Sequence, residues 1–149
     1  MNSDGKSNIK LIGRNQEDLE VLSAYLQDSI IKVKDIVFLK QNRTFVMIVN
    51  RFMWEDVEKG AFRKNKRIKC AVKFEEVIKV ESKNINQKNK KKPMEFLAMK
   101  CSTSLDQTYK TMIFFAGSSI ITVITEAIEV VLQDLGNPWS TKYIPKHKI

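Results

Sequence analysis

The residue types that favour binding chemistry gather in the segment NRFMWEDVEKG, residues 50–60. Arg51, Phe52 and Trp54 are there, and tryptophan and arginine contribute much of the binding energy in many protein interfaces. The alternative is structural: Phe52 and Trp54 would cover the end of the core, and Arg51 would pair with one of the acids that follow. The segment therefore predicts either a partner-binding edge or a strand end that closes the core.

Two basic segments indicate a different chemistry. Residues 63–69, RKNKRIK, and residues 83–92, KNINQKNKKK, carry five positive charges each, and subtracting these ten from the net charge of +9 leaves −1 for the rest of the chain. Nucleic-acid binding needs clustered cations and, for single strands, rings that stack on bases. The first segment follows Phe62 and has Trp54 upstream, so the nucleic-acid hypothesis rests on Arg63, Lys64, Lys66, Arg67 and Lys69. Two solvated loops are the competing interpretation.

The side chains for catalysis and metal binding are few. His147 is the only histidine, and Cys70 and Cys101 give no recognisable metal-ligand spacing. The five glycines form no phosphate-binding loop. We therefore expect no cofactor and no metal, and both cysteines reduced. Glu76 is the most interesting acid, because it interrupts an apolar strand face and would be partly buried.

The elements that must position these residues follow from hydrophobic periodicity. Leu19, Leu22 and Leu26 share one helical face after the candidate cap Asn15, which predicts an N-terminal helix that packs on a sheet. Residues 35–52 alternate as two strands joined by a short turn at residues 41–43, an antiparallel hairpin.

Further strands are predicted from residue 67 to residue 82, with a bulge or bend at Glu75 and Glu76, and within residues 94–102, 109–117 and 118–124. Residues 125–136, TEAIEVVLQDLG, show helical spacing and end before Pro138, which predicts a C-terminal helix. The fold class is thus α+β: a mainly antiparallel, bent sheet or partial barrel of about six to seven strands with an N-terminal and a C-terminal helix. A pleckstrin-homology-like barrel is one architecture that fits.

One domain is expected over residues 1–149, with residues 1–7 disordered, residues 83–93 a flexible basic loop and residues 136–149 an extended tail. Trp139 in that tail is costly to expose, so we expect it to pack on the protein's own body or on a partner. The chain has no signal-peptide pattern and no long apolar run. A cytoplasmic protein without membrane contact is the expectation.

Several short stretches resemble a known family: VLSAYLQD in the first helix, NRFMWE at residues 50–55, FAGSSI at 115–120 and DLGNPWSTKYIPKH near the end. In order and spacing they are similar to the domain-of-unknown-function family 2948, known chiefly from alphaproteobacteria, over roughly residues 8–147. The resemblance implies a bacterial cytoplasmic protein. It implies no activity, cofactor or partner.

The leading functional hypothesis is a non-catalytic module that binds a protein partner through Arg51, Phe52, Trp54 and Trp139. RNA or DNA binding through the basic loop at residues 63–69 is the alternative. An enzyme of unknown chemistry is the third hypothesis, and a concave polar pocket at Glu76 would favour it.

Overall fold

Antiparallel strands dominate the fold, which a computed structural model describes for residues 8–55 and 65–141. The described residues form ten strands and one α-helix. In chain order these elements are β1 (Lys10–Gly13), α1 (Gln16–Leu26), β2 (Ile30–Lys32), β3 (Ile36–Leu39), β4 (Thr44–Phe52), β5 (Lys66–Phe74), β6 (Val77–Lys83), β7 (Pro93–Thr103), β8 (Tyr109–Phe115), β9 (Ser119–Thr125) and β10 (Val130–Ser140). Two short 3-10 turns, Val33–Asp35 and Lys40–Asn42, flank β3.

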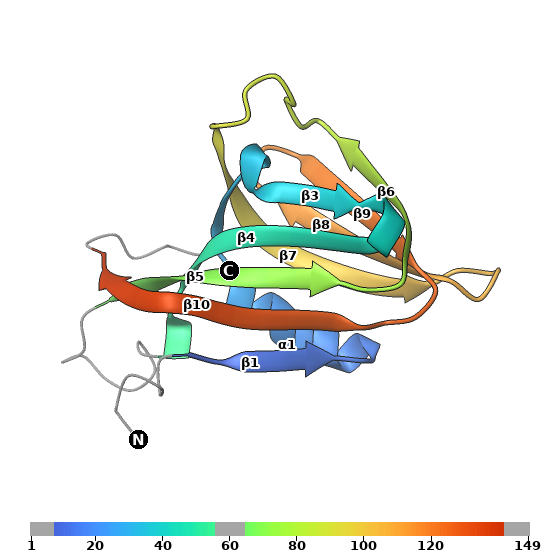
Figure 1. Ribbon diagram of the computed structural model, residues 1–149, viewed down its shortest axis with the longest axis horizontal. Helices are drawn as coiled ribbons and strands as arrows, with labels where there is room; N and C mark the ends of the chain where they lie inside the picture. Colours follow the sequence, from blue (N-terminus) through green and yellow to red (C-terminus); the bar gives the residue numbers. More distant parts are fainter. Residues whose placement is uncertain (1–7, 56–64, 142–149) are drawn as a thin grey trace.

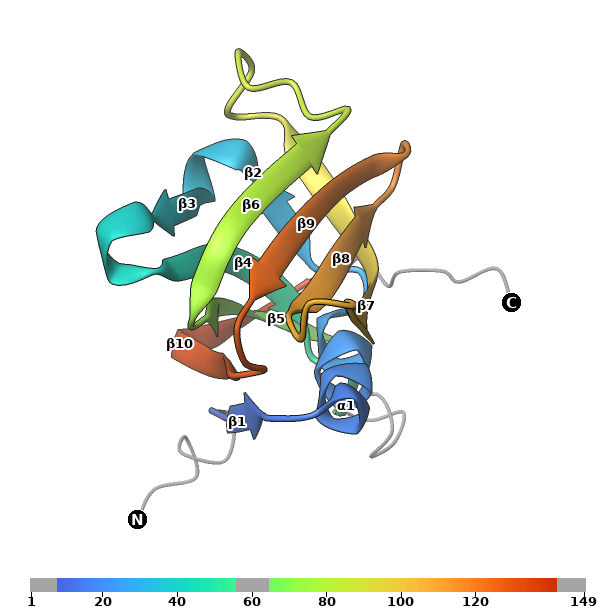
Figure 2. The ribbon, with the colours of Figure 1, turned by 90° about the vertical axis from the view of Figure 1, so that its right-hand side faces the viewer.

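The strands pair in the order β1-β10-β5-β4-β2-β7-β8-β9-β6, and β3 pairs with β4 beside β2. The three-residue β2 joins two halves: β1, β10, β5, β4 and β3 on one side, and β7, β8, β9 and β6 on the other. Figure 1 shows the first half in front with α1 and β7 behind it, and Figure 2 shows the two halves wrapped round a common interior. The sheet is strongly bent and remains open between β3 and β6.

The core lies between these two halves. It consists of the inward side chains of both and of one face of α1, among them Leu19, Leu22, Leu26, Phe45, Met47, Val49, Val72, Phe74, Phe96, Phe115, Val123 and Leu132. Burying the three leucines of α1 is favourable by roughly 1.5–3 kcal/mol each, which is what fixes this helix on the sheet.

The structure confirms the predicted N-terminal helix, which is α1. Asn15 caps α1 by accepting a hydrogen bond from the Asp18 N–H at 2.7 Å, and the predicted leucines are buried. The Ser23 hydroxyl accepts a hydrogen bond from the Met99 N–H at 3.0 Å, so the helix is fastened to β7. The hairpin of β3 and β4 is also confirmed, with Arg43 in the left-handed conformation at its turn (φ 54°).

The predictions of six to seven strands and of a C-terminal helix were wrong. Residues 130–140 form β10 and pair with β5 and β1, because the inward positions Val130, Leu132 and Asp134 alternate with period two. Asp134 hides this alternation in the sequence, since a polar side chain at an inward position looks like a break in a strand pattern.

The single strand predicted from residue 67 to residue 82 is divided into β5 and β6 at Glu76. Glu76 has a left-handed backbone (φ 55°), and its side chain is 51% exposed and lies 3.8 Å from the Arg43 guanidinium. The predicted bend is therefore confirmed, but Glu76 is not partly buried in an apolar face. The short strands β1 and β2 account for the rest of the difference in strand number.

Candidate functional site

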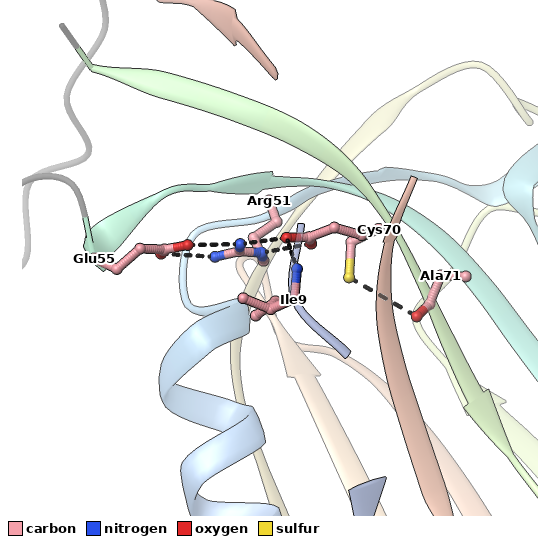
Figure 3. A network of polar contacts seen from close by, with 6 residues as sticks. Ile9, Arg51, Glu55, Cys70 and Ala71 are labelled. Carbon is pink, nitrogen blue, oxygen red and sulfur yellow. Dashed lines mark hydrogen bonds and ion pairs between the residues drawn. The ribbon is translucent and has the colours of Figure 1, made fainter. Parts of the chain in front are cut away.

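Arg51 is the centre of a buried ionic network (Figure 3). It lies on the inner side of β4, where its side chain is 0% exposed. Its Nε donates to Asp134 Oδ1 at 3.0 Å and its Nη2 to Asp134 Oδ2 at 2.8 Å, while Nη1 and Nη2 donate to the two Glu55 oxygens at 2.9 and 2.8 Å. One guanidinium thus binds two carboxylates through paired hydrogen bonds, the strongest geometry available to it.

The network joins segments that are distant in the sequence. Asp134 comes from β10, and its Oδ2 also accepts a hydrogen bond from the Ile9 N–H at 3.1 Å, just before β1. Burial disfavours the charged guanidinium, but the hydrogen bonds to Glu55 and Asp134 outweigh it, so the pKa of Arg51 is raised above its ordinary value. The predicted pairing of Arg51 with a following acid is confirmed at Glu55; Asp56 lies outside the described residues.

Cys70 lies beside this network on β5 and is fully buried. Burial and the neighbouring Asp134 carboxylate raise the pKa of its thiol well above the ordinary value. A thiol held protonated in this way is a poor nucleophile. Cys70 and Cys101 are both free thiols, and Cys101 is half-buried.

The aromatic residues of the predicted site meet at one corner of the sheet. Phe52 on β4 and Trp139 on β10 are both register partners of Arg67 on β5, so the three form one row across three strands. The Arg67 guanidinium lies 5.5 Å from the centroid of the Phe52 ring. The Trp54 ring meets Phe52 edge-on at 4.6 Å, and the Trp54 indole N–H donates to the Gln27 carbonyl at 2.8 Å.

Burial separates the roles of the four predicted partner-binding residues. Arg51 and Phe52 are 0% exposed and Trp54 is half-buried, whereas Trp139 is 41% exposed. Arg51 also points to the opposite side of β4 from Phe52, since successive residues of a strand alternate. The structure therefore brings Phe52, Trp54 and Trp139 to one corner and places Arg51 inside the protein.

The residues predicted to bind nucleic acid do not form one exposed basic patch in the part of the chain that the structure describes. Arg63 and Lys64 lie outside the described residues. Arg67 is buried, with 7% of the residue exposed, and its Nη1 donates to the carbonyls of Asp28 and Asn50 at 3.2 and 3.1 Å. Lys66 is half-buried at the end of β5, and Lys69 is exposed in the next row of the sheet.

The row of Trp139 belongs to a larger outer face, which we define by the outward side chains of β1, β10, β5, β4 and β3. Its longest row runs over five paired strands as Ile12, Val131, Lys73, Val46 and Val37. Ile12, Val37, Leu39, Leu135 and Trp139 are each between 38% and 46% exposed. These five make up most of the nine exposed large hydrophobic residues found in the described part of the chain.

The charge on the outer face is positive. Lys10, Lys69 and Lys73 project from it, and among residues 8–55 and 65–141 the one carboxylate in an ion pair with them is Glu75 at the rim, 3.1 Å from Lys73. Glu75 also accepts a hydrogen bond from the Thr44 hydroxyl at 3.0 Å. The face thus combines apolar side chains with lysines.

A carboxyl pair at the join between the two halves escaped the sequence analysis. Asp28, which follows α1 with φ 64°, is 3% exposed, and its side chain is hydrogen-bonded to Glu95 on β7. Burial, then the hydrogen bond and the charge of Glu95, raise the pKa of Asp28 to about 7, while Arg67 opposes the shift. No local pattern connects residues so far apart in the sequence, so nothing in the sequence predicts this pair.

The described residues contain no group of three or more histidine, cysteine, aspartate or glutamate side chains placed to hold a metal ion. No helix among them has the length and apolar character to cross a membrane. His147 lies outside the described residues.

The fold and its surfaces define a small protein built on an open, bent antiparallel sheet, with an ionic network inside and an apolar, lysine-bearing face outside. Residues 9–147 match the family described as "Protein of unknown function (DUF2948)", and the chain belongs to that family. Neither the curated proteins nor the solved structures contain a match to this chain.

Proposed function

We propose that this protein is a non-catalytic interaction module that binds a protein partner on the outer face, with Trp139 as the principal contact. The single observation that supports this most is the row structure of that face: exposed apolar side chains of β1, β10 and β3 lie on one side of five adjacent strands, with the half-buried Val46 and Ile48 of β4 between them. Contiguous exposed apolar surface of this kind marks interaction sites in soluble proteins.

The partner's chemistry follows from the charge of the face. Lys10, Lys69 and Lys73 stand among the apolar side chains, so a complementary surface carries carboxylates round an apolar centre. A second copy of this chain would oppose lysine to lysine, and like charges placed face to face cost affinity. We therefore propose a different, acidic protein as the partner.

The residues predicted from the sequence have distinct parts in this proposal. Trp139 and, at the rim, Trp54 contact the partner. Phe52 supports both, because its ring packs on Trp54 and under Arg67. Arg51 contacts nothing outside; it holds Asp134 on β10, the strand that presents Leu135 and Trp139.

The experiment is capture from native lysate followed by binding with the purified partner. Trp139→Ser should weaken binding tenfold or more, since truncating an aromatic residue that dominates a contact costs about 2 kcal/mol or more. Leu105→Ser is the matched control, because Leu105 is fully exposed in the β7–β8 turn and lies off the outer face. Lys69→Glu should also weaken binding relative to the wild type, and it should reduce the salt dependence of the affinity.

The result that refutes the proposal is equal partner binding by the wild type and by Trp139→Ser. Capture that disappears on nuclease treatment, together with a salt-sensitive mobility shift on RNA or DNA, would replace it with the nucleic-acid alternative. A captured protein whose binding surface is basic would also refute it.

A further inference from the structure

The open side of the sheet, away from the outer face, holds an apolar groove. β6 ends the path of paired strands and β3 pairs with β4, so the two strands face each other across the opening without being paired (Figure 2). The groove between them has a volume of about 270 Å³, and its floor is formed by Val33, Ile36, Phe38, Val80, Ile85 and Ile121. Glu81, Ser82 and Gln87 form its rim.

A second, polar hollow continues from the groove. It has a volume of about 350 Å³ and shares Val33 and Ile85 with the groove. Three asparagines, Lys92 and Glu95 contribute to its lining: Asn84, Asn86 and Asn89 supply the amides. An apolar space and a polar space therefore meet at the side chain of Ile85.

The lysine-rich segment of residues 83–92 forms the border of both spaces. Ile85 packs against the core, and the Lys34 N–H donates to the Lys90 carbonyl at 3.0 Å, which fastens the segment to the turn before β3. Of the five lysines of this segment, Lys92 lines the polar hollow and the other four are exposed, and the one carboxylate in the lining is Glu95. The local field favours an anion.

We propose that the groove and the polar hollow together bind an anionic amphiphile with a linear apolar chain. The chain would lie between β3 and β6, and the head group would accept hydrogen bonds from Lys92 and from the amides of Asn86 and Asn89, since the Asn84 amide already donates to the Ser118 carbonyl at 3.1 Å. The groove alone is smaller than the roughly 300 Å³ at which sites for drug-sized ligands begin, which suits a narrow chain and not a ring system. This proposal is independent of protein binding at the outer face.

Decanoate is the probe, and its binding to the full chain is followed by amide NMR shifts and by calorimetry. Decanoate should shift the amides of Val80, Ser82 and Ile85, and decanol should bind about threefold more weakly, since an exposed ion pair contributes up to about 1 kcal/mol. Acetate, which has the head group alone, should cause no shift at these residues.

Two variants and their controls locate the two spaces. Ser82 on β6 is exposed on the groove rim, so Ser82→Trp should fill the groove and reduce decanoate affinity at least tenfold. The control Ser102→Trp should leave the affinity unchanged, because Ser102 lies at the end of β7 away from the polar hollow. Lys92→Ala should lower decanoate affinity to that of decanol, and Lys100→Ala should not.

Several results would overturn the proposal. Absence of decanoate shifts in the groove, or equal affinity of Ser82→Trp and the wild type, would show that the groove takes no chain. Equal affinities for decanoate and decanol, or no effect of Lys92→Ala, would show that the hollow takes no anionic head. Trp139→Ser should bind decanoate normally, so failure of the outer-face proposal is distinguishable from failure of this one.

Discussion

Replacing Arg51 by methionine tests the buried network directly. Arg51 is the cation that pairs with Asp134 in this network, and the Asp134 side chain is 0% exposed. Its removal leaves a carboxylate in the interior without a cation, although the Ile9 N–H still donates to it. Removing one member of a buried ion pair typically costs about 3–5 kcal/mol, because the other charge stays buried without compensation. That is a large share of the 5–15 kcal/mol by which most domains are stable.

The assay is urea unfolding at neutral pH, followed by tryptophan fluorescence. Arg14→Met is the matched control, since Arg14 is exposed and should cost less than about 0.5 kcal/mol. The double variant Arg51→Met/Asp134→Leu should recover much of the loss, because apolar residues of similar volume replace buried ion pairs at little cost. Glu55→Gln should cost less than Arg51→Met, because Glu55 is 23% exposed and water can take over part of its role.

Two results would refute this reasoning. If Arg51→Met and Arg14→Met lowered the free energy of unfolding equally, the guanidinium would not be compensating a buried charge. If the double variant were less stable than Arg51→Met by the full cost of a second core substitution, Asp134 would be stabilising without Arg51. Either outcome would remove the electrostatic account of how β10 is held.

Three further predictions concern other parts of the fold. The pKa of Asp28 is raised from 3.8 to about 7, so the folded state binds a proton more tightly than the unfolded state, and the free energy of unfolding falls as pH rises between these values. Asp28→Asn removes this loss and should therefore raise the free energy of unfolding more at pH 8 than at pH 5, as measured by urea titration at both pH values. Gly13→Ala should cost about 1–3 kcal/mol, because the new Cβ would lie 2.8 Å from Leu19 Cδ2, and a drop in thermal midpoint checks it. Asn15→Ala should cost about 1 kcal/mol through loss of the α1 cap, whereas Asn15→Asp should retain most of it.

The sequence predicted those elements whose pattern is local. α1 was predicted from its cap and leucine face, and the β3–β4 hairpin from alternation and a turn, because each signal lies within the element itself. The bend at Glu76 was predicted for the same reason. β10 failed because its decisive residue is explained by a partner 83 positions away: Asp134 fits an inward strand position only when Arg51 stands opposite.

The candidate site shows the same limit. Phe52, Trp54 and Trp139 were chosen for their types, and the register that puts Phe52 and Trp139 either side of Arg67 could not be read from the sequence. The same holds for the five-strand row of the outer face and for the Asp28–Glu95 pair, which depend on pairing between distant strands. The lysine-rich segment was expected to be a flexible loop, and its single apolar residue, Ile85, is what connects it to the core.

Strand β10 links the buried network to the proposed binding surface. Asp134 points inward to Arg51, and its neighbour Leu135 points outward, with Trp139 following after a register shift. The ion pair therefore fixes which side of β10 faces out, since a slip of one residue would exchange the inward and outward side chains. Arg51 can thus affect partner binding while being 0% exposed. A variant that breaks the pair should lose partner affinity through displacement of Trp139, whereas the more conservative Arg51→Lys, which retains the charge without the bidentate geometry, should lose less.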